Sequence, residues 1–287
     1  MPEFHGRLVV LGATGFVGSH VVERATSVGW DVVALSSRDV DLAHAAGGAA
    51  LAAIVRDGDT VVHAAAVVPS KNASDVSRNL LMTQALVDAL AGVEVAQLVV
   101  VSSDAVYGSE SGVVDEASPC TPDSLHGVMS LAREMVCAEV STPVLTLVRP
   151  AAIYGFGDTH NSYGPNRFAR QALESGQITV FGAGEATRDH VAIADVADVI
   201  VRAIASRQAG IINVASGQSI SFADLAGLVR DSAPAGTRVA VAGSESSPTF
   251  RTYDISGLAR RFPDLVPTGP AQGVRQMISA MQGSTQA

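Results

Sequence analysis

The run Gly12-Ala13-Thr14-Gly15-Phe16-Val17-Gly18 has residue types and a spacing that could bind phosphate. It follows an apolar run typical of a β-strand and precedes a segment with helical spacing. Glycines at such a turn let a pyrophosphate approach the backbone, and the helix N-terminus favours an anion. A tight glycine turn without a ligand is the alternative. The run predicts a dinucleotide-binding turn in which the coenzyme contacts are Gly12, Thr14, Gly15, Phe16, Val17 and Gly18.

The residues after the second expected strand indicate which dinucleotide binds. An acidic residue at this position binds the ribose hydroxyls of NAD, whereas an arginine accommodates the 2′-phosphate of NADP. The strand ends in Leu35-Ser36-Ser37-Arg38, and the first acidic residue is Asp39. Two hydroxyls and a guanidinium suit a phosphate, so Ser36, Ser37 and Arg38 favour NADP(H), with NAD as the alternative. Arg38 could otherwise be a solvated surface charge.

Alternating strands and helices are needed to position this turn. Apolar, β-branched runs predict strands at Leu8–Leu11, Val32–Leu35, Thr60–His63, Leu98–Ser102 and Leu145–Val148. Helical spacing predicts helices at Gly18–Val28, Gly48–Asp57, Ser74–Ala91 and His126–Val140. Continuous apolar strands separated by helices are typical of a parallel sheet covered on both faces. The sequence therefore predicts an α/β protein with a doubly wound parallel Rossmann sheet in residues 1–150.

The pattern changes after Pro150, where a loop over Tyr154–Asn166 is expected. Helices are predicted at Arg167–Ser175, Ala194–Ser206, Phe222–Ser232 and Ala271–Met281, and strands at Ile178–Phe181 and Gly210–Val214. We expect a smaller C-terminal substrate-binding lobe formed by residues 151–185 and 216–287, with residues 186–215 returning to the dinucleotide-binding domain.

The composition excludes several classes of protein. The chain has 287 residues, 47% of them hydrophobic, and a formal net charge of −9. A nucleic-acid-binding surface is therefore not expected. The two cysteines, Cys120 and Cys137, have no metal-ligand spacing, so no metal site is expected. The first residues lack a basic region followed by a long apolar one, and no apolar stretch nears the ~20 residues of a membrane helix, so we expect neither a signal peptide nor a membrane span. We expect a cytoplasmic protein with no membrane partner.

Several motifs resemble the extended short-chain dehydrogenase/reductase family, which comprises nucleotide-sugar epimerases, dehydratases and reductases. They are the G-x-x-G-x-x-G spacing, Val40-Asp41-Leu42, Val62-His63-Ala64-Ala65-Ala66 with Asn79, Ser102-Ser103-Asp104-Ala105-Val106-Tyr107-Gly108, and Arg149-Pro150-Ala151-Ala152-Ile153-Tyr154-Gly155. The resemblance implies that Asp41 and Leu42 contact the adenine and that Ser103 is the catalytic Ser/Thr. It places the coenzyme against Ala64, Ala65 and Ala66, after the family's fourth strand, with Pro150 and Ile153 near the nicotinamide.

Two later motifs resemble the family's substrate-binding signatures. Arg188-Asp189-His190-Val191 with Asp195-Val196-Ala197 is similar to R-D-x-V…D-V-A, and Arg251-Thr252-Tyr253-Asp254 is similar to R-x-x-D. The resemblance implies that Arg188 and Arg251 bind the diphosphate of a nucleotide, and guanidinium forks suit that role. Arg167 is a further candidate. The alternative is that Arg188 pairs with Asp189 or Asp195, and Arg251 with Asp254.

The chain departs from the family at its reactive Tyr-x-x-x-Lys pair. In Pro122-Asp123-Ser124-Leu125-His126-Gly127-Val128-Met129-Ser130, the flanking pattern puts His126 at the tyrosine and Ser130 at the lysine. The chain's only lysine is Lys71. His126 could replace the tyrosine as proton donor, because an imidazole titrates near neutral pH. Otherwise Asp104, Tyr154 or Tyr163 transfers the proton, or the protein is a non-catalytic, dinucleotide-binding regulatory protein.

Within the family, the run Ser37-Arg38-Asp39-Val40-Asp41-Leu42 resembles the cofactor-selecting stretch of NADPH-dependent reductases. We therefore expect an NADP(H)-dependent oxidoreductase acting on a nucleotide-activated sugar, specifically a 4-ketoreductase of a nucleotide-linked deoxysugar. A nucleotide-sugar epimerase or dehydratase is the alternative enzyme. Asp104 matches the acid of sugar 4,6-dehydratases, but Ala105 stands where their glutamate follows. Members of the family often form homodimers.

Overall fold

The computed structural model describes residues 4–243 and 248–285, and the chain divides into two compact units. Unit 1 comprises Met1–Gly108, Glu116–Pro150 and Val196–Asn213. Unit 2 comprises Ser109–Asp115, Ala151–Asp195 and Val214–Ala287. The predicted boundaries differ most at residues 186–195, which belong to unit 2 because their strand pairs with other strands of that unit.

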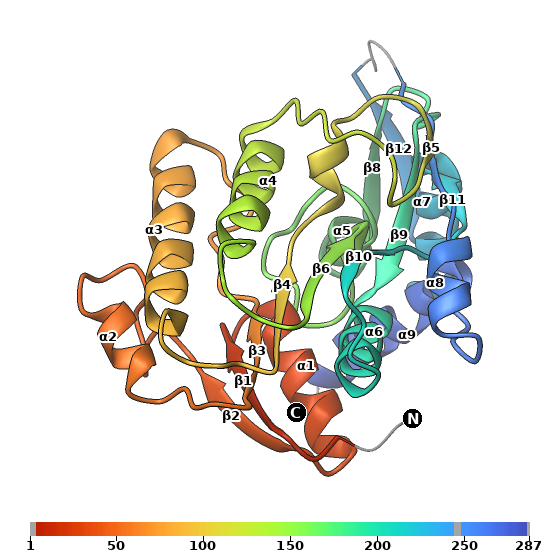
Figure 1. The fold of residues 1–287 in the computed structure, drawn as a ribbon. Coiled ribbons are helices and arrows are strands. Elements are labelled where there is room, and N and C mark those ends of the chain that lie inside the picture. Colours follow the sequence, from red (N-terminus) through yellow and green to blue (C-terminus); the bar gives the residue numbers. More distant parts are fainter. Residues whose placement is uncertain (1–3, 244–247, 286–287) are drawn as a thin grey trace. The chain divides into compact units, whose positions relative to one another are not determined.

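Unit 1 is built on a six-stranded sheet with the order β10-β6-β4-β3-β1-β2, and the α/β fold with a parallel central sheet is confirmed (Figure 1). The strands are β1 (Arg7–Leu11), β2 (Asp31–Leu35), β3 (Thr60–His63), β4 (Gln97–Val101), β6 (Leu145–Pro150) and β10 (Gly210–Val214). The helices are α1 (Phe16–Ser27), α2 (Gly47–Ala52), α3 (Ala73–Leu90), α4 (Leu125–Cys137) and α6 (Ile193–Ala205). The 3-10 helix η1 (Asp104–Tyr107) follows β4.

Side chains alternate between the two faces of this sheet. On one face, Val9 and Leu11 of β1 belong to a buried cluster with Leu86 of α3 and Cys137 of α4. The residues between them point to the other face, because the side-chain period of a strand is two. Helices α3 and α4 cover the first face, and α1 and α6 cover the second (Figure 1). Both faces are therefore buried, which explains the continuous apolar strands.

The chain order reverses at β1, which lies between β2 and β3. In open α/β sheets, ligands bind outside the carboxyl ends of the strands at such a point. Helix α2 leads directly to β3 beside β1, so Ala64–Ala66 follow the third strand of this chain rather than a fourth. The topology thus brings the β1–α1 turn, the β2 end and the β3 end to one edge of the sheet.

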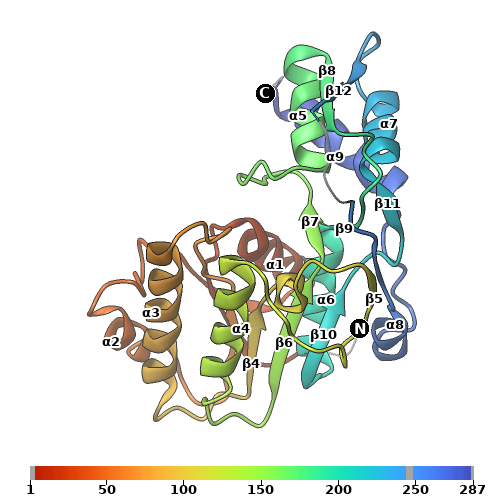
Figure 2. The same ribbon diagram turned by 90° about the horizontal axis from the view of Figure 1, so that it is seen from above.

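In its described residues, unit 2 combines small sheets with helices, most of which are labelled in Figure 2. Strand β9 (Thr187–Ala192) pairs with β7 (Ala152–Tyr154) in parallel and with β11 (Ser219–Ser221) antiparallel. Strand β8 (Gln177–Phe181) pairs with β12 (Arg238–Ala242), and β5 (Gly112–Val114) pairs with β13 (Arg251–Tyr253). The helices are α5 (Pro165–Ser175), α7 (Phe222–Ser232), α8 (Ser256–Arg261) and α9 (Pro270–Thr285). Apolar side chains of α5, β8, α7 and α9 form one buried core.

Candidate coenzyme and catalytic site

Glycines shape the turn between β1 and α1. Gly12 has a φ of +80°, and a Cβ on it would lie 2.7 Å from the backbone nitrogen and the Cα of Ala65. A Cβ on Gly18 would lie 2.1 Å from the carbonyl oxygen of Gly12. Real Cβ atoms essentially never make contacts this short. The first turn of α1 therefore lies directly on the backbone of the turn, and neither glycine can be enlarged without movement.

The N-terminus of α1 presents backbone N–H groups. Its capping residue, Gly15, makes no side-chain cap hydrogen bond. Thr14 and Gly15 are exposed, while Phe16 and Val17 are half-buried. The unpaired N–H groups and the positive end of the helix favour an anion. A cradle that a Cβ would fill, beside a helix N-terminus, fits the pyrophosphate of a dinucleotide.

The loop after β2 contains an acid that accepts hydrogen bonds within the loop, Asp39, and an exposed arginine, Arg38. The Asp39 carboxylate accepts hydrogen bonds from the Ser36 hydroxyl at 2.7 Å and the Ser36 backbone nitrogen at 2.9 Å, and both lower the pKa of Asp39. The Ser36 hydroxyl also accepts from the Arg38 backbone nitrogen at 3.2 Å. Ser37 and Arg38 are exposed. Within residues 4–243 and 248–285, the Arg38 guanidinium has no hydrogen bond or ion pair.

The other predicted coenzyme contacts of unit 1 flank this loop and the glycine turn. An oxygen of the Asp41 carboxylate accepts from the Ala43 backbone nitrogen at 3.0 Å, and Leu42 is buried. The backbone nitrogen of Ala64 donates to the Leu11 carbonyl at 3.0 Å, which holds residues 64–66 beside the end of β1. Pro150 ends β6 in unit 1, whereas Ile153 lies in β7 of unit 2.

Ser103 and Asp104 lie side by side where β4 leads into η1. The Ser103 hydroxyl accepts a hydrogen bond from the Ala105 backbone nitrogen at 3.1 Å and donates to Asp104 Oδ1 at 3.3 Å. Ser103 thus caps η1, and both residues remain half-buried. The two predicted catalytic residues of this segment form one hydrogen-bonded pair.

The start of α4 lies directly against η1. A Cβ on Gly127 would lie 2.3 Å from the carbonyl oxygen of Ala105, so only glycine allows this approach. Ser124 caps the helix by accepting from the Gly127 backbone nitrogen at 3.1 Å. His126 is half-buried in this first turn. Ser130 is buried, and its hydroxyl donates to the His126 carbonyl at 2.9 Å.

A buried ionic network supports the segment that contains Ser103 and Asp104. Arg149 donates to both oxygens of Glu134, at 2.9 and 2.6 Å, with each side chain only 4% exposed. The Ser102 hydroxyl donates to Glu134 Oε1 at 2.5 Å, and Arg149 donates to the Tyr107 hydroxyl at 2.9 Å. Tyr107 in turn donates to Asn213 Oδ1 at 2.8 Å. One ion pair therefore anchors both ends of the segment, a role that the sequence motifs did not indicate.

The two tyrosines considered as alternative proton donors are engaged in the core of unit 2. Tyr154 is 2% exposed, and burial is the main cause that raises its pKa above the usual value. The Tyr163 hydroxyl accepts from the Phe181 backbone nitrogen at 2.9 Å, and its ring packs against Phe168 and Phe222. Both residues support the fold of unit 2.

The three predicted substrate-binding arginines all lie in unit 2. The Arg167 guanidinium lies 6.0 Å from the Tyr163 ring centre and 5.8 Å from that of Phe181. Arg188 is half-buried in β9 and donates to the Thr187 carbonyl at 3.1 Å. Arg251, in β13, is 4% exposed and donates to the Glu110 carbonyl at 3.4 Å.

The acids considered as partners for these arginines accept hydrogen bonds from serine and threonine residues of unit 2. Asp189 accepts from the backbone nitrogen and the hydroxyl of Ser216, at 2.7 and 2.9 Å. Asp195 accepts from the Thr268 backbone nitrogen at 2.7 Å and the Thr268 hydroxyl at 3.0 Å. Asp254 accepts from the Ser256 backbone nitrogen at 2.8 Å. These carboxylates hold turns of unit 2 in place.

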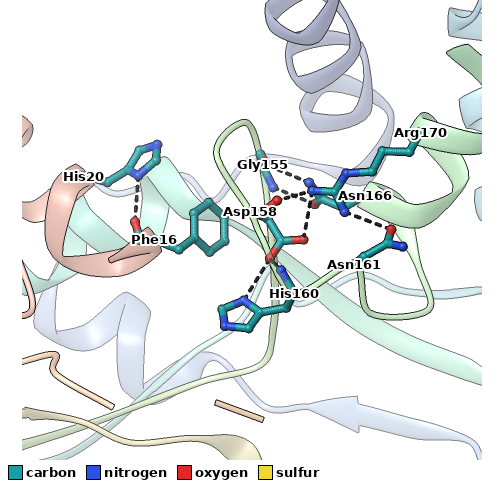
Figure 3. Close-up of polar contacts among 8 residues, drawn as sticks. All are labelled: Phe16, His20, Gly155, Asp158, His160, Asn161, Asn166 and Arg170. Atoms are coloured by element: carbon teal, nitrogen blue, oxygen red, sulfur yellow. Dashed lines mark hydrogen bonds and ion pairs between the residues drawn. The ribbon is translucent and has the colours of Figure 1, made fainter. Parts of the chain in front are cut away.

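A charged cluster organises the loop before α5 (Figure 3). Asp158 Oδ1 lies 3.0 Å from His160 Nδ1, and Arg170 donates to the Asp158 carbonyl and to Asn161 Oδ1. Asn161 has a φ of +51°. Burial raises the pKa of Asp158, but the hydrogen bonds and charges of His160 and Arg170 outweigh it and hold the pKa below its usual value. The sequence predicted a loop here but not its cluster.

The model of the NAD dependent epimerase/dehydratase family matches residues 8–215 of this chain. The chain belongs to this family. The match extends from the first residues of β1 to the end of β10, and so includes the glycine turn, Ser103 and α4.

Relatives in the NAD dependent epimerase/dehydratase family include both epimerases and reductases. The chain is 30% identical over 232 residues to UDP-glucose 4-epimerase of Mycolicibacterium smegmatis, covering 69% of this chain and 72% of the relative. It is 29% identical over 205 residues to dTDP-4-dehydrorhamnose reductase of Mycobacterium tuberculosis, covering 68% of this chain and 64% of the relative. The Thermus thermophilus UDP-glucose 4-epimerase complex with NAD superimposes with a TM-score of 0.83 at 24% identity, covering 97% of this chain and 99% of that chain.

Two kinds of feature are absent from the described residues. No helix in the described part of the chain is long and apolar enough to cross a membrane. Over the same residues, no group of three or more His, Cys, Asp or Glu side chains could hold a metal ion.

Proposed function

We propose that this protein is an NADP(H)-dependent oxidoreductase that reduces a keto group of a nucleotide-activated sugar, specifically the 4-keto group of a nucleotide-linked deoxysugar. The proposal combines membership in the family with the polar groups at the end of β2. The dTDP-4-dehydrorhamnose reductase relative supports the reaction class.

The observation that carries the coenzyme preference is the division of roles between Asp39 and Arg38. A carboxylate selects NAD by accepting hydrogen bonds from the ribose hydroxyls. Asp39 already accepts two hydrogen bonds from Ser36, whereas Arg38 extends into solvent. A guanidinium in that place binds a phosphate with charge-assisted hydrogen bonds. The loop therefore favours the 2′-phosphate of NADP.

In this proposal, Ser103 binds the substrate carbonyl, His126 transfers the proton, and Asp104 holds the Ser103 hydroxyl before the substrate binds. When bound, the coenzyme supplies the hydride. Ser103 donates a hydrogen bond to the substrate carbonyl, and His126 donates a proton to the same oxygen from its imidazole. Without substrate, the Ser103 hydroxyl donates its single proton to Asp104 Oδ1 at 3.3 Å, so binding of the substrate carbonyl must turn this donor away from Asp104. In unit 2, Arg188 and Arg251 bind the diphosphate, with Arg167 as a further contact.

An epimerase is the second candidate, favoured by the relative from Mycolicibacterium smegmatis. It would oxidise and then reduce the same sugar carbon, and would retain its coenzyme between the two steps. The loss of tyrosine and lysine from α4 favours a third candidate, a dinucleotide-binding protein without redox activity. Retention of coenzyme through purification distinguishes the second candidate, and the absence of turnover distinguishes the third.

The coenzyme preference is tested with Arg38→Asp, using Arg56→Asp as the matched control. Arg56 is an exposed arginine of unit 1 that precedes β3, at the amino end of the strands. Arg38→Asp should weaken NADPH binding about 10- to 100-fold in calorimetry, because charge-assisted hydrogen bonds to the phosphate are lost. NADH binding should not weaken, and Arg56→Asp should change neither constant.

The reaction class is tested by mixing the wild-type protein and NADPH with nucleotide-linked 4-keto-deoxysugars in a single turnover. Loss of NADPH absorbance at the rate of product formation is the expected result. NADH binding more tightly than NADPH in the wild type would contradict the coenzyme assignment. Interconversion of sugar epimers with no net NADPH consumption would replace the reductase with the epimerase.

A further inference from the structure

Arg133 is a buried cation on the face of α4 that carries the two replaced dyad positions. His126, Ser130 and Arg133 are spaced i, i+4 and i+7, so they share one helical face. Arg133 is 2% exposed. Helical side chains lean toward the helix N-terminus, which directs Arg133 back toward the turn of Ser130.

The guanidinium of Arg133 joins two strand ends of the candidate site. It donates to the Val101 carbonyl at 3.2 Å and to the Ala65 carbonyl at 3.2 Å. Val101 precedes Ser102 and Ser103, and Ala65 lies in the segment predicted to line the coenzyme. The last residues that pair between β3 and β4 are His63 and Val100. Arg133 therefore bridges the two chain segments just beyond the point where the strands stop pairing.

Arg133 makes no ion pair in the part of the chain that the structure describes, and its Nε is buried without a hydrogen-bond partner. Burial lowers the pKa of Arg133, and the charges of Cys137 and Glu134 offset this effect only in part. The adjacent Glu134 binds Arg149 instead. His63 is fully buried, and burial together with the charge of Arg133 keeps its pKa well below the usual value, so its imidazole is neutral. A buried cation with no ion-pair partner is costly, which makes Arg133 a candidate for a functional role.

We propose that Arg133 is the active-site cation of this protein and replaces, from one helical turn further along α4, the positive charge that the resemblance places at position 130. Ser130 cannot supply this charge, and its hydroxyl is used on the His126 carbonyl. The inference rests on the proposed function, because it assumes that a nicotinamide coenzyme binds at the ends of β3 and β4.

A fixed positive charge at this place distinguishes the two redox forms of the coenzyme. Oxidised and reduced forms have the same phosphates but differ by one positive charge on the nicotinamide. Repulsion between like charges disfavours the oxidised form in a medium of low dielectric constant. Arg133 therefore favours binding of the reduced coenzyme, which is the form that a ketoreductase consumes.

The test is the ratio of the dissociation constants of NADP+ and NADPH, measured by calorimetry on the full chain. Arg133→Gln keeps an amide donor but removes the charge, and should lower this ratio about three- to tenfold. Arg133→Lys keeps the charge and should keep the ratio. Ser130→Lys added to Arg133→Gln returns a cation to the same helical face and should restore the ratio. Arg56→Gln, at an exposed arginine, is the control and should leave it unchanged.

The outcomes separate this inference from the proposed function. An unchanged ratio in Arg133→Gln, with both coenzymes still bound, overturns the inference. The role of Arg133 would then be to hold the ends of β3 and β4 together, and the reductase proposal would remain. A wild-type protein that binds neither coenzyme overturns both. If Arg133→Gln does not fold, Ser130→Lys alone replaces it, since a second cation on that face should raise the ratio and no change would refute the inference.

Discussion

The β1–α1 turn and the first half of α4 both lie beside carboxyl ends of neighbouring strands, yet they are built in different ways. The turn is made of backbone: it needs glycine at positions 12 and 18, and in the proposal its N–H groups bind the coenzyme. Helix α4 works through side chains, and at positions 126 and 130 those side chains are a histidine and a serine. Gly12 and Gly18 match the glycine motif of the family that the chain resembles, whereas His126 and Ser130 stand where the resemblance places tyrosine and lysine.

The comparison teaches that a backbone site and a side-chain site tolerate change differently. Any Cβ at Gly12 or Gly18 meets backbone atoms, so the phosphate-binding turn is kept whole or lost. On α4 the packing contacts come from residues other than His126 and Ser130: Gly127 lies against Ala105, and Glu134 binds Arg149. The scaffold of the catalytic segment is therefore separable from its reactive groups.

The largest expected effect tests that scaffold. Glu134→Ala leaves Arg149 buried without its partner, and breaking such a pair costs about 3–5 kcal/mol of the free energy of unfolding. Urea or thermal unfolding measures this loss. Glu139→Ala, an exposed glutamate just after α4, is the control and should cost less than about 0.5 kcal/mol. Similar losses in both variants would mean that the ion pair does not anchor the Ser103 segment.

Much of unit 1 follows from its sequence, because its signals are local and repeated. Strand β3 was predicted at its observed bounds, and β1, β2 and β4 to within one residue, since each is a short apolar run between helical segments. In unit 2, the three-residue strands β5, β7, β11 and β13 were not predicted. Each pairs with a partner far away in the sequence, and three residues are too few to show a period.

In the candidate site too, the residues of a local motif could be predicted, whereas the residues whose roles depend on distant contacts could not. The glycine turn could be predicted because one motif contains every residue that it needs. The roles of Arg133 and Glu134 could not, since they depend on which carboxylate lies near which guanidinium, and both side chains looked like ordinary helix residues. Helical spacing from Ser130 could have singled out Arg133. Similarly, only the structure shows that Asp39 is occupied by Ser36 while Arg38 is not.

The second prediction tests the backbone site with two glycines of nearly equal φ. Gly12 and Gly29 have φ of +80° and +81°, but a Cβ on Gly29 would meet nothing within 4 Å. Gly12→Ala should cost about 2–4 kcal/mol of stability, from backbone strain plus overlap with Ala65, and should abolish coenzyme binding in calorimetry. Gly29→Ala pays the strain alone, about 1–2 kcal/mol, and should keep the coenzyme dissociation constant. Coenzyme binding that survives Gly12→Ala would show that the turn is not the phosphate site.

The third prediction addresses the side-chain site. His126→Phe removes the proposed proton donor from a helix whose packing is fixed by Gly127 and Glu134, so coenzyme affinity and stability should change little. The single-turnover reduction rate should fall about 100-fold, the lower range for a lost general acid. Asp104→Asn is the comparison, because Asp104 accepts the Ser103 hydroxyl only before substrate binds and its loss should cost less. A larger loss in Asp104→Asn than in His126→Phe would move the proton-donor role to Asp104. The active site would then have been remodelled around the end of β4, with α4 kept only as a support.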